Sequence, residues 1–157
     1  QLVEQTTHIF DLARHLAGEI VEVFTFSQNN PALLHYPDGD VNVADAVCLR
    51  FENGAVGILT DTNGLHAPGE VGLKVYTPKR VVEVSWGRMV ESEANRKEEY
   101  FSQDNPYLRE AETFLQAIRT GDRSLIRADY HDGVRTLAVT LAADESARTG
   151  TPIKVPR

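Results

Sequence analysis

Sulfur, long apolar runs and export signals are scarce in this sequence. Cys48 is the only cysteine among 157 residues, so the chain can form no internal disulfide. Its position in an alternating segment favours a buried structural thiol and a reducing compartment. No apolar run approaches the ~20 residues that span a bilayer, and the N-terminal residues carry no charged-then-apolar export signal. We therefore expect a cytoplasmic protein with no membrane partner.

Basic clusters and phosphate-binding loops are also missing. The formal net charge is -7 and Lys and Arg form no run, which argues against a nucleic-acid partner. Neither G-x-G-x-x-G nor G-x-x-x-x-G-K-[ST] occurs, so we expect no cofactor-binding residues for a dinucleotide in this chain. The chain begins at Gln1 within a segment that already has a structured pattern, and Met89 is its only methionine. We therefore expect a fragment of a longer protein.

The segment of residues 4–18 has the pattern of a first helix. Ile9, Leu12, Ala13 and Leu16 recur at i, i+3, i+4 and i+7 and predict one apolar stripe that faces the core. Thr6 or Thr7 is expected to cap the N-terminus, and Gly18 is expected to form a left-handed C-terminal cap.

Seven segments then have strand-like composition, at residues 19–26, 44–51, 55–62, 71–76, 81–86, 88–93 and 96–101, of which 88–93 is the weaker. Asn53-Gly54 predicts a tight hairpin. Two helices are predicted after Asn105 and after Asp129, and residues 153–155 could add an edge strand. In the last helix the stripe expected to face the core contains Val134, Leu137, Ala138 and Leu141.

This order predicts an α+β fold, an open-faced and predominantly antiparallel β-sheet of about six strands with helices packed on one face. We expect residues 1–157 to form a single domain, because no linker or repeat divides them. Three helices cannot cover both faces of such a sheet. The open face is therefore predicted to bury itself against another subunit or domain.

His8 is the first candidate for chemistry. In the first turn of a helix, the positive end of the helix dipole favours the neutral, proton-accepting imidazole. Glu4, four residues earlier, could orient it as an acid partner. A capping or surface histidine is the alternative. A metal site made of His8, Asp11 and His15 is another, although two helical turns separate the histidines and Asp11 could simply pair with Arg14 or His15.

His66 lies in the loop of residues 62–69, between two glycines and beside a proline, where a binding role and a solvated surface position both remain open. His35 and His131 are similar. Ser146 has no G-x-S-x-G around it, which argues against serine hydrolysis.

The arrangement of residues 4–18, with Glu4, His8, Asp11 and Gly18, resembles the start of the C-terminal domain of the Gfo/Idh/MocA oxidoreductases, a family named for glucose-fructose oxidoreductase and inositol dehydrogenase. Residues 49–55 resemble the central hairpin of that domain, and residues 132–135 and 142–153 resemble its last helix and terminal strand. The resemblance spans essentially the whole chain.

The resemblance implies a dihydrodipicolinate-reductase-like C-terminal domain that binds substrate and oligomerises through its open sheet face. It implies that His8 exchanges a proton with a substrate hydroxyl or carbonyl while hydride passes to or from NAD or NADP, and that Glu4, in place of the more usual aspartate, assists it. Asn63 and His66 are implied to contact a sugar, cyclitol or polyol.

The family's N-terminal Rossmann dinucleotide-binding domain is absent from this chain. The isolated fragment is therefore expected to be inactive and to bind no NAD(P). A non-catalytic oligomerisation module is the alternative function.

Overall fold

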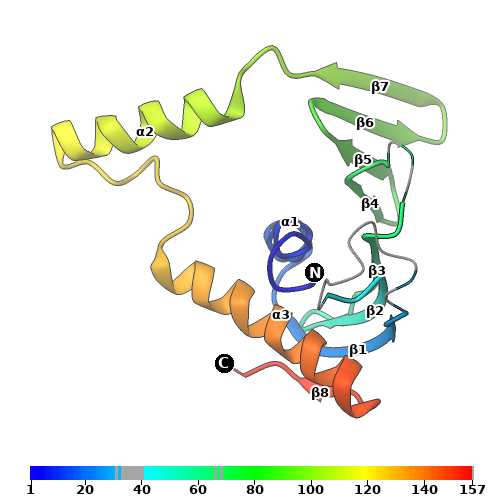
Figure 1. Ribbon diagram of the computed structural model, residues 1–157. Coiled ribbons are helices and arrows are strands. Elements are labelled where there is room, and N and C mark those ends of the chain that lie inside the picture. Colours follow the sequence, from blue (N-terminus) through cyan, green and yellow to red (C-terminus); the bar gives the residue numbers. More distant parts are fainter. Residues whose placement is uncertain (31, 33–40, 66, 68, 157) are drawn as a thin grey trace. The chain divides into compact units, whose positions relative to one another are not determined.

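The computed structural model describes residues 1–30, 32, 41–65, 67 and 69–156 (Figure 1). The chain forms two compact units. Unit 1 contains Gln1–Gly69 and Val134–Arg157, and unit 2 contains Glu70–Gly133. The elements are, in chain order, α1 (Thr7–Ala17), β1 (Ile20–Gln28), β2 (Ala44–Phe51), β3 (Val56–Thr62), β4 (Gly72–Tyr76), β5 (Val81–Ser85), β6 (Arg88–Glu93), β7 (Arg96–Phe101), α2 (Pro106–Thr120), α3 (Tyr130–Thr149) and β8 (Ile153–Lys154).

The α+β class and the antiparallel pairing are confirmed, but the described strands form two four-stranded sheets where one of about six strands was predicted. Their orders are β3-β2-β1-β8 in unit 1 and β4-β5-β6-β7 in unit 2. The segment between β3 and β4 contains Asn63, Gly64 and Gly69, turn-forming residues that interrupt a ladder. The ladder of backbone hydrogen bonds between strands therefore ends at β3, and a second ladder begins at β4.

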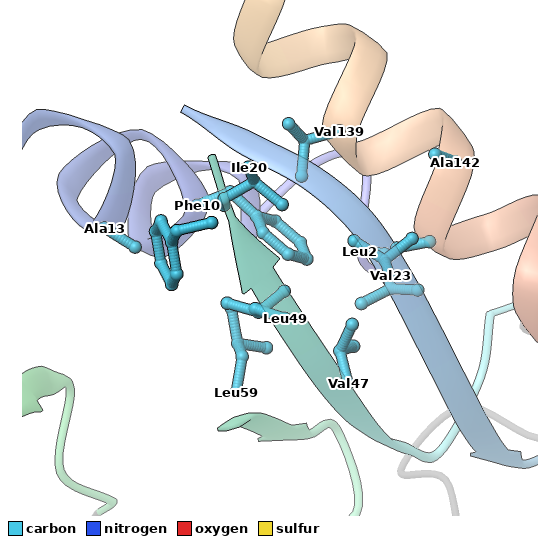
Figure 2. Close-up of a cluster of buried hydrophobic side chains, with 12 residues drawn as sticks. Leu2, Phe10, Ala13, Ile20, Val23, Val47, Leu49, Leu59, Val139 and Ala142 are labelled. Atoms are coloured by element: carbon cyan, nitrogen blue, oxygen red, sulfur yellow. The ribbon is translucent and has the colours of Figure 1, made fainter. Parts of the chain in front are cut away.

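The core of unit 1 lies between its sheet and the two helices α1 and α3, which cover the same face (Figure 2). Phe10 and Ala13 of α1 and Val139 and Ala142 of α3 meet the apolar side chains of β1 to β3, among them Val47, which is fully buried. The predicted packing of helices on one face is confirmed for this sheet.

The predicted apolar stripe is confirmed in part for α1, where Ala13 is buried and Ile9 packs against the core, and it is wrong for α3. In α1, Phe10 is 0% exposed whereas Leu16, assigned to the stripe, is 45% exposed. In α3, Val134, Leu137 and Leu141 are exposed, and the buried face consists of small or β-branched residues: Thr136, Val139, Thr140, Ala142, Ala143 and Ser146. Small side chains let the helix approach the sheet closely, which larger leucines would prevent.

Polar contacts hold α1 to the rest of unit 1. The Arg14 side chain is 4% exposed; it donates to both carboxylate oxygens of Glu19 at 3.0 Å and to the Thr136 hydroxyl at 2.6 Å. At the helix C-terminus, the Asn53 side-chain amide of the β2–β3 turn donates to the Ala17 carbonyl at 2.7 Å. Gly18 follows with φ 95° and ψ -173°, a conformation open essentially to glycine alone, although not the left-handed helical one predicted.

The other face of the unit 1 sheet is exposed and largely apolar. Cross-strand rows join Phe24, Cys48 and Ile58, and then Phe26, Ala46 and Thr60. Phe26 is 67% and Ile58 75% exposed. Cys48 is exposed as well, so the predicted burial of its thiol is wrong; the alternation of β2 places it opposite the core residues Val47 and Leu49.

Unit 2 contains the second sheet and α2. The Asn105 side chain accepts hydrogen bonds from the backbone amides of Tyr107 and Leu108, which confirms the predicted N-terminus of α2. Asp129 accepts from the Asp132 amide at 2.8 Å and in the same way caps α3. No helix within the described residues combines the length and the apolar character that crossing a bilayer requires.

Candidate functional site

The start of α1 and the turn that precedes it contain the two residues predicted to carry proton transfer. His8 and Glu4 are both exposed. Residues 1–6 form a turn in which the Glu4, Gln5 and Thr6 amides all approach the Gln1 carbonyl, and α1 continues directly from it. Among the described residues no hydrogen bond or ion pair joins Glu4 to His8. The two side chains are accessible to a substrate, and their partnership stays a prediction.

Thr6 connects this turn to the sheet. It is 5% exposed, its backbone is helical, and its hydroxyl makes no helix-capping bond. The hydroxyl instead donates to Oδ2 of Asp61, near the end of β3. Since Thr6 lies two residues from both Glu4 and His8, and Asp61 lies two residues before Asn63, this bond brings the predicted proton-transfer and substrate-binding segments to one end of the sheet.

A second carboxylate, that of Asp45, lies beside Asp61. The two residues are cross-strand partners, and the Asp45 amide donates to Oδ1 of Asp61 at 3.2 Å. Asp45 is 3% exposed; its Oδ1 accepts from the Ser27 hydroxyl and, at 2.9 Å, from the Asn42 side-chain amide. Its Oδ2 is buried with no hydrogen-bond partner among the described residues.

Asn63 is held at the same end. Its backbone amide donates to the Val43 carbonyl at 2.7 Å, and its side-chain amide donates to the Asn42 carbonyl at 3.1 Å. No described residue donates to its Oδ1, which leaves an acceptor for a ligand hydroxyl. His66, the other predicted substrate contact, lies outside the described residues.

Burial raises the pKa of Asp61, and the neighbouring Asp45 carboxylate raises it further. The hydrogen bonds from the Thr6 hydroxyl and the Asp45 amide act in the opposite direction and do not cancel the rise. Burial beside a second carboxylate therefore favours retention of a proton at Asp61.

Asp11 and His15 lie apart from this chemistry. Oδ1 of Asp11 accepts from the Thr136 hydroxyl at 2.7 Å and lies 3.6 Å from the Arg14 guanidinium, so the predicted pairing with Arg14 is confirmed. His15 is exposed near the C-terminal end of α1. No group of three His, Cys, Asp or Glu side chains in the described part of the chain is arranged to hold a metal ion.

The sequence contained a signal for the carboxylate pair. Asp45 shares one face of its strand with Val47, Leu49 and Phe51, and Asp61 shares a face with Leu59. Aspartates on the apolar faces of two adjacent strands are costly to bury, and both belong to this hydrogen-bonded site.

Comparisons with known proteins support the same architecture. A family model described as the GFO/IDH/MocA C-terminal domain matches residues 1–83. The chain is 24% identical over 165 residues to myo-inositol 2-dehydrogenase of Thermotoga maritima, covering 98% of this chain and 48% of the relative. It is 28% identical over 171 residues to an uncharacterized protein of Schizosaccharomyces pombe, covering 92% of this chain and 41% of the relative.

Among solved structures, levoglucosan dehydrogenase in complex with NADH and levoglucosan has the same fold over 99% of this chain and 50% of that chain, with a TM-score of 0.83 and 21% sequence identity. The present chain thus spans about half the length of the relatives that it matches.

Proposed function

The chain belongs to the Gfo/Idh/MocA C-terminal domain family, and from this premise we propose that residues 1–157 form the substrate-binding domain of an NAD(P)-dependent oxidoreductase acting on a sugar, cyclitol or related polyol. The similarity to dehydrogenases of myo-inositol and levoglucosan supports the substrate class. The observation that carries the proposal is the Thr6–Asp61 bond, because it joins the segment with His8 to the segment with Asn63.

In the proposed reaction His8 is the proton-transfer residue. Its imidazole accepts the proton of the substrate hydroxyl during oxidation and returns it during reduction. Glu4 orients the imidazole, and Asn63 and His66 contact substrate hydroxyls. Asn63 offers its Oδ1 as the acceptor.

The residues of this chain do not fit a dinucleotide phosphate site, since the sequence has no glycine-rich phosphate loop. NAD or NADP, which supplies or accepts the hydride when bound, is therefore assigned to a Rossmann domain outside this chain. A cytoplasmic location stays a prediction, based on the low cysteine content.

Replacement of His8 in the full-length protein tests the proposal. His8→Ala should lower the rate by roughly 10²–10⁴-fold, the usual contribution of a general base. His15→Ala is the matched control, because His15 is also exposed on α1 but takes no part in proton transfer; its rate should stay within about twofold. A loss below about threefold for His8→Ala with an unchanged pH profile would contradict the role of His8.

The exposed sheet face supports a second function, assembly of a homo-oligomer. Its Phe24, Phe26, Cys48 and Ile58 side chains form a continuous apolar surface, as expected where a second copy binds. An oligomer in which His8→Ala has no effect would favour a non-catalytic oligomerisation module.

Light scattering tests this assembly. The wild-type protein should be oligomeric, and Ile58→Glu should shift it toward the monomer because it buries a charge in the interface. Leu16→Glu, at an exposed position on α1, is the control and should leave the assembly intact. A wild-type monomer at high concentration argues against this surface as an interface.

A further inference from the structure

Three polar side chains replace the apolar core at one end of the unit 1 sheet. Ser27, Asp45 and Asp61 are direct cross-strand partners on β1, β2 and β3, and they share the core face with the apolar row of Val47 and Leu59. Oδ2 of Asp45 is buried and has no hydrogen-bond partner among the described residues. An apolar row there would avoid the cost of burying that oxygen.

Each aspartate of this row accepts a hydrogen bond from a different segment of the candidate site. Asp61 accepts the Thr6 hydroxyl and so holds the first turn of α1. Asp45 accepts the Asn42 side-chain amide at 2.9 Å, and the Asn42 carbonyl in turn accepts the Asn63 side-chain amide at 3.1 Å. The contact of Asp61 with Thr6 thus forms one branch of the network, the Asp61 branch, and the contacts from Asp45 through Asn42 to Asn63 form the other, the Asp45 branch. The hydrogen bond from the Asp45 amide to Asp61 Oδ1 connects the two branches.

We propose that Asp61 and Asp45 are positioning residues, Asp61 fixing the segment from Glu4 to His8 at the start of α1, and Asp45 fixing Asn63 through Asn42. The positioning stands on the geometry alone, whereas its consequence for catalysis rests on the proposed function. The two branches predict separate kinetic effects. Loss of the Asp61 branch displaces the proton-transfer residue and lowers kcat, and loss of the Asp45 branch displaces a substrate contact and raises KM.

A pair of Thr6 variants tests the Asp61 branch in the full-length protein. Thr6→Val keeps the shape of the buried side chain but removes the hydroxyl donor, and Thr6→Ser keeps the donor and removes a methyl group. Thr6→Val should lower kcat about tenfold with KM within about twofold, and Thr6→Ser should stay within about twofold of wild type in both. Equal losses in the two variants would show that packing, not the hydrogen bond, matters, and would overturn the proposal.

Asn42→Ala tests the Asp45 branch. It removes the side chain that Asp45 holds and leaves the Asn42 carbonyl in place. We expect KM to rise about tenfold with kcat within about twofold. A fall in kcat with unchanged KM would contradict the assignment of this branch to substrate binding.

Hydrogen exchange separates a failure of this proposal from a failure of the proposed function. Backbone amides of residues 7–10 should exchange about tenfold faster in Thr6→Val than in wild type or Thr6→Ser, because the first turn opens more easily without its link to Asp61. If the wild-type protein has no oxidoreductase activity, this exchange measurement alone decides the positioning. Unchanged exchange in Thr6→Val overturns it.

Discussion

The side of α1 that faces the core can be decided by comparing two alanine substitutions. Phe10 is 0% exposed and lies in the core between the sheet and the helix, whereas Leu16 is 45% exposed. Truncation of a fully buried phenylalanine leaves a cavity that neighbouring residues fill only in part. Phe10→Ala should therefore lower the free energy of unfolding by about 3–5 kcal/mol. For a chain of 157 residues this corresponds to a drop in Tm of roughly 6–20 °C.

Leu16→Ala should cost less than about 1 kcal/mol, because half of the side chain is already in water and alanine has the higher helix propensity. Urea unfolding followed by circular dichroism measures both variants, and an unchanged m-value confirms that the difference lies in stability. A cost for Leu16→Ala equal to that for Phe10→Ala would contradict the burial of Phe10 and the exposure of Leu16.

Three further predictions concern stability. Val139→Ala should destabilise the chain by about 0.5–2 kcal/mol more than Leu137→Ala, although valine is the smaller residue, because Val139 is buried and Leu137 exposed; thermal unfolding of the two variants compares them. Glu19→Gln should cost about 2 kcal/mol in urea unfolding and Arg14→Met less than about 1, because the first substitution leaves the buried guanidinium with the more distant Asp11 carboxylate, 3.6 Å away, and the second leaves a partly exposed carboxylate that still pairs with Arg135 at 3.3 Å; the reverse order would contradict this account. For Asp61, whose pKa is raised in the folded state from an ordinary 3.8, the stabilising contribution is complete below that value and is lost as pH rises through the folded-state pKa. Urea unfolding at increasing pH, from below 3.8 upward, should therefore show the free energy of unfolding of wild type falling relative to that of Asp61→Asn. A difference between the two proteins that does not change with pH would contradict the raised pKa of Asp61.

Strands and turns of this chain could be predicted well from sequence because their signals are local. The predicted segment at residues 44–51 coincides with β2, and the Asn53-Gly54 turn lies where the hairpin signal places it. In β2 the alternation of side chains is unambiguous, since a strand has only two faces. The same alternation exposes Cys48, for which a buried thiol was predicted.

Helix faces were predicted only in part, because both α1 and α3 carry apolar residues on more than one side. The periodicity of Val134, Leu137 and Leu141 is as regular as that of the true core face, which uses alanine, threonine and serine. Close approach of a helix to a sheet selects small side chains, and a hydrophobicity pattern does not register that requirement. Sequence therefore locates α3 but not the side of it that packs.

The candidate site was predicted in part. The positions of His8 and Glu4 follow from one local motif, and the structure shows both to be accessible. The Thr6–Asp61 link joins residues 55 positions apart, and no local pattern reports a contact at that separation. Such a contact emerges only when the β2–β3 hairpin and α1 are packed together.

The hydrogen bonds at the two ends of α1 make its length and that of the hairpin interdependent. Thr6 is held by Asp61 at the open end of the hairpin, and Ala17 is held by Asn53 at its turn. The 11 residues of α1 rise about 16 Å, and the six residues from Val56 to Asp61 extend about 20 Å, so the helix and the strand measure nearly the same span. An insertion in the hairpin would leave α1 too short to make both the Thr6–Asp61 and the Ala17–Asn53 hydrogen bonds. A family member with a longer hairpin is therefore expected to have a longer α1 as well.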